Sequence, residues 1–124
     1  LRNSTDALVD QMADEVKAHA VKLGQKSGLN IQIEQVSSYP AQAFHADCID
    51  AVARAASKLG YSNMPAVSGA GHDAVYMARL APSGMIFIPC KDGISHNEIE
   101  DAKPEHITAG CNVLLHAMLE RAGT

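Results

Sequence analysis

The sequence contains no tryptophan and has few other aromatic residues, namely three tyrosines and two phenylalanines among 124 residues. Proteins that bind single-stranded nucleic acids stack the bases on aromatic side chains and follow the backbone with clustered lysine and arginine. Here the formal net charge is −4, and the basic residues form no stripe along the chain. The composition therefore predicts that nucleic acid is not a partner.

Long apolar runs are also missing. No stretch approaches the roughly 20 apolar residues that a transmembrane helix needs, and residues 1–4 (LRNS) show no signal-peptide pattern. We therefore expect no membrane partner. The length, with 47% apolar and 19% charged residues, is typical of a soluble globular protein with room for one ordinary domain.

Cysteine is scarce, with only Cys48, Cys90 and Cys111, and their spacing fits neither a metal knuckle nor a CxxC motif. An odd number of unpaired cysteines favours a reducing cytoplasm over a disulfide framework. Cys90 alone lies near the candidate site described below. It is either a nucleophile, which would need an adjacent base, or a small residue buried at the end of a strand.

Apolar residues recur every three or four positions in three long segments, which predicts three amphipathic helices. A fourth, shorter helix is expected to begin near Asp73. Each long helix is bounded by residues with known preferences for helix ends. These residues are Ser4 or Thr5 before the first helix and Gly28 after it, Gly60 after the second, and Pro104 and Gly123 around the last.

Two segments have the patterns of strands. Residues 30–37 alternate, with Ile31 and Ile33 on one face. Residues 85–89 (MIFIP) form an unbroken apolar run, which predicts a strand buried on both faces of a parallel or mixed sheet. Helices alternating with strands indicate an α/β fold. Because a lone strand at 30–37 is not stable by itself, we expect the chain to be the tail of a longer protein.

Residues 68–74 (SGAGHDA) lead from an extended segment into the short helix. Gly69 and Gly71 allow the backbone amides to approach a ligand, and a helix N-terminus favours an anionic group. The alternative is a tight turn in which Asp73 caps the helix. The loop lacks the third glycine of a dinucleotide-binding fingerprint. His72 is a ligand, a substrate contact, or a capping and packing residue.

His96 lies in residues 91–97 (KDGISHN), directly after the predicted strand 85–89. Loops at the carboxyl ends of strands form the ligand crevice of open α/β sheets, so His96 is a candidate metal ligand or acid–base group. Hydrogen-bond acceptors near it in the sequence could hold the tautomer of the imidazole, namely Ser95, Asn97, Glu98 and Glu100. A zinc site needs three or four protein ligands, and the sequence shows no other ligand pair at a recognisable spacing. Arg2 is either an exposed charge or a bidentate clamp for a carboxylate.

Four segments together closely resemble the C-terminal part of the amidase, hydantoinase/carbamoylase family. The segments are residues 68–74, 81–89 (APSGMIFIP), 91–97 and 109–116 (AGCNVLLH). This family comprises N-carbamoyl-L-amino acid hydrolases, allantoate amidohydrolases and β-ureidopropionases of the M20 metallopeptidase clan. The resemblance implies an α/β catalytic domain like that of zinc aminopeptidases, interrupted by a smaller α/β lid through which two subunits dimerise. Residues 1–38 would belong to the lid and residues 39–124 to the C-terminal part of the catalytic domain.

The resemblance also implies an activity, hydrolysis of the C–N bond of a ureido acid such as an N-carbamoyl-L-amino acid or allantoate. Members use two divalent metal ions per intact subunit, zinc or manganese, with a glutamate as general base. His96 matches the last metal-ligating histidine. Arg2 matches the lid arginine that binds the substrate carboxylate, and the loop of Gly69, Gly71 and His72 matches a substrate contact.

The family's catalytic residues and remaining ligands would precede Leu1. We therefore expect no catalytic residue in this chain, and neither stoichiometric metal nor activity in the isolated 124 residues. The alternative function is a catalytically inactive interaction module that retains the lid helix for dimerisation.

Overall fold

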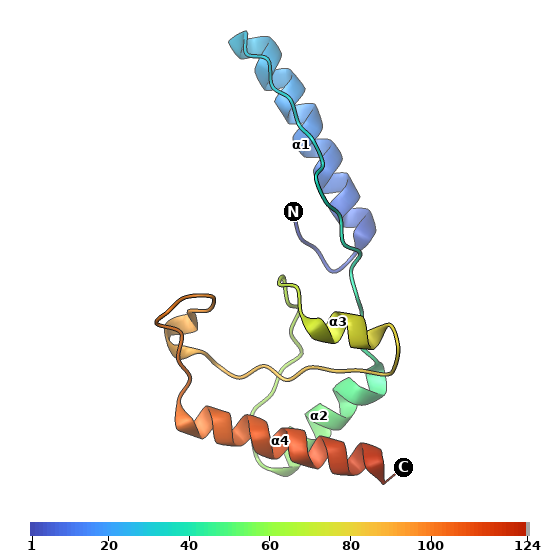
Figure 1. Cartoon of the computed structure of the whole chain (residues 1–124), viewed down its shortest axis with the longest axis vertical. Helices are drawn as coiled ribbons and strands as arrows, with labels where there is room; N and C mark the ends of the chain where they lie inside the picture. Colours follow the sequence, from blue (N-terminus) through green and yellow to red (C-terminus); the bar gives the residue numbers. More distant parts are fainter. Residues whose placement is uncertain (124) are drawn as a thin grey trace. The chain divides into compact units, whose positions relative to one another are not determined.

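A computed structural model describes residues 1–123 of the chain, and its regular elements are helical (Figure 1). The elements are α1 (Asp6–Ser27), α2 (Ala46–Lys58), α3 (Asp73–Ala78), the 3-10 helix η1 (Lys91–Gly93) and α4 (Pro104–Ala122). The chain forms two compact units, Leu1–Ala43 with Val67–Ala70 and Phe44–Ala66 with the residues from Gly71 onward. The assignment of residues 1–38 to a lid and of residues 39–124 to a catalytic domain stays a prediction.

The helix ends lie where the sequence predicts them. Thr5 is the N-cap of α1, and Gly28 ends the helix in the left-handed conformation, with φ of 72°. Its N–H donates to the Gly24 carbonyl at 2.9 Å, which satisfies one of the last free carbonyls of the helix. Pro104 occupies the first turn of α4, and Gly123 follows its last residue. The predictions of these helices are confirmed.

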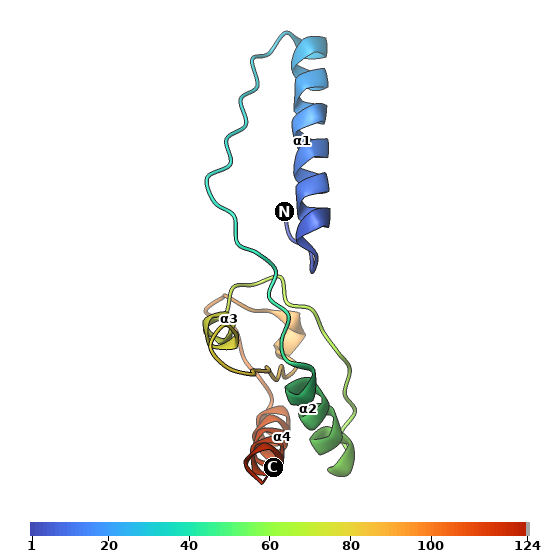
Figure 2. The same cartoon turned by 90° about the vertical axis from the view of Figure 1, so that its right-hand side faces the viewer.

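In the first unit, the segment after α1 runs back along that helix in an extended conformation, as Figures 1 and 2 show. Ile31 lies next to Gly24, so that a Cβ on the glycine would be 3.9 Å from Ile31 Cγ1. At the other end, the Ala41 N–H donates to Asp6 Oδ1 at 2.7 Å. The segment therefore starts at the C-terminal end of α1 and returns to its first residue.

In the second unit, α2 and α4 pack against each other. Small side chains fill the contact: Ala51, Ala55 and Ala56 of α2, with Val113 and Ala117 of α4. Alanines allow the two helix backbones to approach closely. The core is correspondingly small, since no large side chain among the described residues is fully buried. Neither α4 nor any other helix within residues 1–123 is long and apolar enough to cross a lipid bilayer.

An ion pair joins α2 and α4 at the edge of this contact. Arg54 Nη2 lies 2.5 Å from Glu120 Oε1, and Arg54 Nε donates to the same oxygen at 3.0 Å. These hydrogen bonds hold the pKa of the Glu120 carboxyl below its ordinary value of 4.5 and raise the pKa of Arg54. Both side chains are well exposed, so the pair adds little to stability.

The two predicted strands, residues 30–37 and 85–89, are extended, but no β-ladder joins either of them to another segment within residues 1–123. A strand is defined by hydrogen bonds to a neighbour, and neither segment has that neighbour here. The α/β class is therefore not confirmed within residues 1–123. Burial of residues 85–89 on both faces is wrong for the described chain. Ile86 and Ile88 are half-buried near α4, whereas Phe87 is 52% exposed and is covered only in part, by the ring of His72.

Candidate functional site

The loop that follows residues 85–89 is closed by its own backbone. The Lys91 N–H donates to the Asp101 carbonyl at 2.7 Å, which joins the two ends of the loop. Inside it, η1 is completed by the Ile94 N–H, which donates to the Lys91 carbonyl at 3.0 Å. This closed loop presents His96 at the exposed surface of the second unit.

His96 has an unusual backbone conformation, with φ of 56°. Residues other than glycine rarely adopt this left-handed region, which costs roughly 1 kcal/mol or more unless the surroundings stabilise it. The His96 N–H donates to Glu100 Oε2 at 2.8 Å. The Ser95 hydroxyl lies 3.3 Å from His96 Nδ1. With Ser95 at Nδ1, Nε2 is the ring nitrogen that can bind a ligand.

A metal ion requires several donor groups that converge on one point. Within residues 1–123, no group of three or more His, Cys, Asp or Glu side chains lies close enough to hold a metal ion. A zinc site takes four ligands, of which a catalytic site draws three from protein. The described residues therefore do not form a metal site on their own. A metal at His96 would need ligands from the rest of a longer protein.

Arg2 and Gly69 lie side by side in the first unit, although they are far apart in the sequence. A Cβ added to Gly69 would lie 3.4 Å from Arg2 Cδ and 3.7 Å from Arg2 Nη1. The arginine side chain therefore lies close to the backbone of the loop, with room for a methyl group at position 69 but little more. The structure thus brings together two of the residues predicted to bind the substrate.

The other two predicted substrate residues have different surroundings. A Cβ on Gly71 would meet nothing within 4 Å, so its backbone is open. His72 is the N-cap of α3, without a side-chain capping bond, and its ring packs against that of Phe87 in a T-shaped arrangement, with a centroid distance of 5.6 Å. Asp73 is the first residue of α3 and not its cap. A packing role for His72 has a structural basis, and its substrate role stays a prediction.

Cys90 is half-buried and immediately precedes η1. No hydrogen bond to its thiol occurs within residues 1–123, so no base there is placed to activate it as a nucleophile. The description as a small residue at the end of an extended segment fits this position better.

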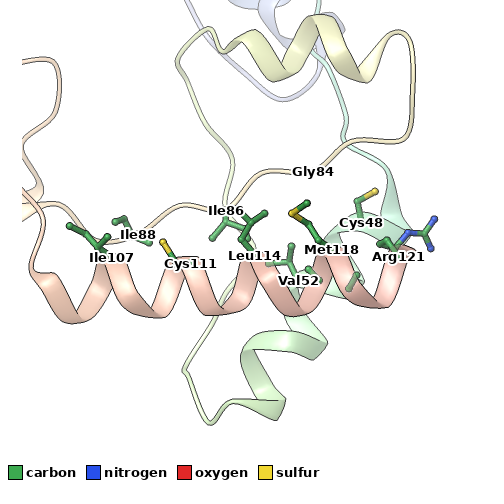
Figure 3. A pocket seen from close by; sticks show the side chains of 13 residues that line it. Cys48, Val52, Gly84, Ile86, Ile88, Ile107, Cys111, Leu114, Met118 and Arg121 are labelled. Carbon is green, nitrogen blue, oxygen red and sulfur yellow. The ribbon is translucent and has the colours of Figure 1, made fainter. Parts of the chain in front are cut away.

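An apolar groove of about 480 Å³ lies between α2, α4 and residues 84–88 (Figure 3). Its side chains on α4 include Ile107, Cys111, Leu114, Met118 and Arg121. The first four belong to the apolar stripe that sequence periodicity predicts for this helix, but periodicity alone does not show that their partners leave a gap. No carboxylate or imidazole of the described residues lines the groove; its polar side chains are the thiols of Cys48 and Cys111 and the guanidinium of Arg121.

The chain matches the family described as Peptidase family M20/M25/M40 over residues 3–120, and it belongs to this family. It is 43% identical to an N-carbamoyl-L-amino-acid amidohydrolase from Rhizobium meliloti, over 98% of this chain and 29% of that protein. It is 33% identical to a ureidoglycolate hydrolase from Oryza sativa subsp. japonica, over 88% of this chain and 23% of that protein.

Among solved structures, the chain is similar to an amidase of the hydantoinase/carbamoylase family from Burkholderia multivorans. The TM-score is 0.95 and the sequence identity 50%, over 98% of this chain and 29% of that one. The resemblance found in the sequence is thereby confirmed. The chain spans less than one third of the length of these relatives.

Proposed function

We propose that this chain is the C-terminal part of a metal-dependent amidohydrolase that cleaves the C–N bond of a ureido acid. Candidate substrates are an N-carbamoyl-L-amino acid and allantoate. The main support is the 43% identity, over nearly the whole chain, to a relative named as an N-carbamoyl-L-amino-acid amidohydrolase. The contact between Arg2 and Gly69 adds a physical basis for recognition of the acid group.

Arg2 is proposed to bind the substrate carboxylate. A guanidinium is planar and can donate two parallel hydrogen bonds to a carboxylate, which fixes its orientation as well as its charge. Gly69 lies against the same side chain, so a substrate held by Arg2 would also meet the backbone at Gly69.

His96 is proposed to be one ligand of one of two divalent metal ions, zinc or manganese, in the intact protein. Such ions polarise a carbonyl and activate water when they are bound. The contribution of this chain is limited to an exposed imidazole whose Nε2 is free to bind. The remaining ligands and the general base would come from parts of the protein outside this chain.

The first unit is proposed to belong to the lid through which two subunits form a homodimer. Large apolar side chains of α1 are exposed, with Leu8 at 45%, Val16 at 46% and Leu23 at 48%. Such side chains are expected to contact other parts of the lid or a second subunit. Three free cysteines are compatible with the proposed cytoplasmic location.

The metal content of the intact protein tests the role of His96. We expect two equivalents in the unmodified protein by elemental analysis. In His96→Ala we expect a fall toward one equivalent, with loss of most activity and little change of fold, because the residue lies on an exposed loop.

His19→Ala is the matched control, since His19 is an exposed histidine on α1. It should keep both equivalents. Full metal occupancy in His96→Ala would contradict the assignment of His96.

A further inference from the structure

The proposed role of His96 requires an imidazole that points in a fixed direction, yet its loop consists almost entirely of exposed residues. Packing therefore cannot hold the ring in place. The backbone of His96 is also in the left-handed region, with φ of 56°, where a residue with a side chain needs external support. Something in the loop must stabilise this conformation.

Glu100 provides that support, because its Oε2 accepts the His96 N–H at 2.8 Å. A turn that begins at Asn97 places Glu100 for this contact. The Ile99 N–H donates to Asn97 Oδ1 at 3.1 Å, and the Glu100 N–H donates to the Asn97 carbonyl at 2.9 Å. The chain thus folds back after Asn97, and the carboxylate of Glu100 reaches the backbone that precedes the turn.

We propose that Glu100 is a positioning residue for His96. It fixes the His96 backbone, and through it the direction of the imidazole, without binding the metal ion itself. This inference rests on the proposed function, in which His96 is a metal ligand. Ser95 acts at a different point, because its hydroxyl lies against the ring nitrogen Nδ1.

Two substitutions of Glu100 distinguish a role of its hydrogen bond from a role of its negative charge. Glu100→Gln removes the charge but keeps an acceptor oxygen at the same reach. Glu100→Asp keeps the charge but shortens the side chain by one methylene group. If reach matters, Gln is the tolerated substitution and Asp the damaging one. If only the negative charge near the metal matters, the order is reversed.

The experiment measures the affinity of the intact protein for Zn²⁺ by competition with a chelator. Loss of a group that orients a metal ligand weakens metal affinity by about 10- to 100-fold. We expect this loss in Glu100→Asp. In Glu100→Gln we expect a change within about threefold, because a neutral acceptor still bonds to the N–H, more weakly than a charged one.

Glu98→Gln is the control, since it removes the same charge two residues away, and Glu98 has no side-chain hydrogen bond or ion pair in the described chain. It should bind Zn²⁺ like the unmodified protein. Thermal unfolding of each metal-free variant shows whether the fold is kept. A Glu100→Asp variant with unchanged affinity, or a Glu100→Gln variant weakened as much as Glu100→Asp, would overturn the inference.

The same data separate this inference from the proposed function. If the unmodified protein binds no Zn²⁺, or His96→Ala binds it with full affinity, the proposed role of His96 fails. If His96→Ala loses a metal ion while Glu100→Asp keeps both with normal affinity, only the role of Glu100 fails.

Discussion

The size of the residue at position 69 should control how well the protein binds the carboxylate of its substrate. A Cβ at this position would lie 3.4 Å from Arg2 Cδ, which is close to the ordinary contact distance between carbon atoms. Gly69→Ala should therefore leave Arg2 in place. The methyl groups of valine extend about 1.5 Å beyond Cβ and have few allowed rotamers, so Gly69→Val should displace Arg2.

The magnitude follows from the interaction that would be lost. A hydrogen bond to a charged group contributes about 1.5–3 kcal/mol, and each 1.4 kcal/mol corresponds to a factor of about ten in affinity. In Arg2→Ala, the KM of the intact protein for an N-carbamoyl-L-amino acid should therefore rise about 10- to 140-fold. Gly69→Val should approach this value, whereas Gly69→Ala should stay within about twofold of the unmodified protein.

The assay is steady-state kinetics with an N-carbamoyl-L-amino acid and with the corresponding carboxamide, which lacks the negative charge. The carboxamide is the control substrate, because Arg2 has no carboxylate to bind and the variants should differ little on it. An unchanged KM for the acid in Arg2→Ala, or equal effects of Gly69→Ala and Gly69→Val, would refute the reasoning.

Three further predictions concern the second unit and the chain as a whole. Gly110→Ala would place a Cβ 2.7 Å from Ile88 Cγ2, so it should destabilise the intact protein by about 1–3 kcal/mol in urea unfolding. In an Ile88→Ala background, Gly110→Ala should instead stabilise the protein by up to about 1 kcal/mol, since alanine is a better helix former than glycine. A loss of stability in that background would show that a clash with Ile88 is not the cause. The stabilisation from the Arg54–Glu120 pair is present at neutral pH and is lost as the pH falls through the lowered pKa of Glu120. NMR titration should show that pKa rising in Arg54→Ala, and an unchanged value would exclude the hydrogen bond as its cause. The isolated 124 residues expose many large apolar side chains and should self-associate in light scattering, so a clean monomer would count against this expectation.

The helices were predictable because their ends are specified locally. Thr5 and Gly28 mark the two ends of α1, and Pro104 and Gly123 mark those of α4. Their conformational preferences depend on only a few neighbouring residues. The strands could not be predicted in the same way, because residues 30–37 and 85–89 become strands only if other segments form hydrogen bonds with them. Their apolar patterns describe which side chains prefer burial, and the described chain supplies only part of that burial, as at Ile86.

The site residues were predictable as types but not as geometry. The residue types alone make the imidazole of His96 a candidate metal ligand and the guanidinium of Arg2 a candidate carboxylate-binding group. The contact between Arg2 and Gly69 joins positions far apart in the sequence, and no local pattern predicts it. The hydrogen bond from His96 to Glu100 depends on a left-handed residue, a conformation that sequence indicates reliably only for glycine.

The most direct test of the central claim is a comparison of two substrates of the intact protein, because its family also includes peptidases. One substrate is an N-carbamoyl-L-amino acid, and the other is a dipeptide with the same C-terminal amino acid. Both present the carboxylate that Arg2 is proposed to bind, so the comparison isolates the C–N bond to be cleaved. We expect a higher kcat/KM for the ureido acid, with release of ammonia. Cleavage of the dipeptide without release of ammonia from the ureido acid would contradict the proposed function.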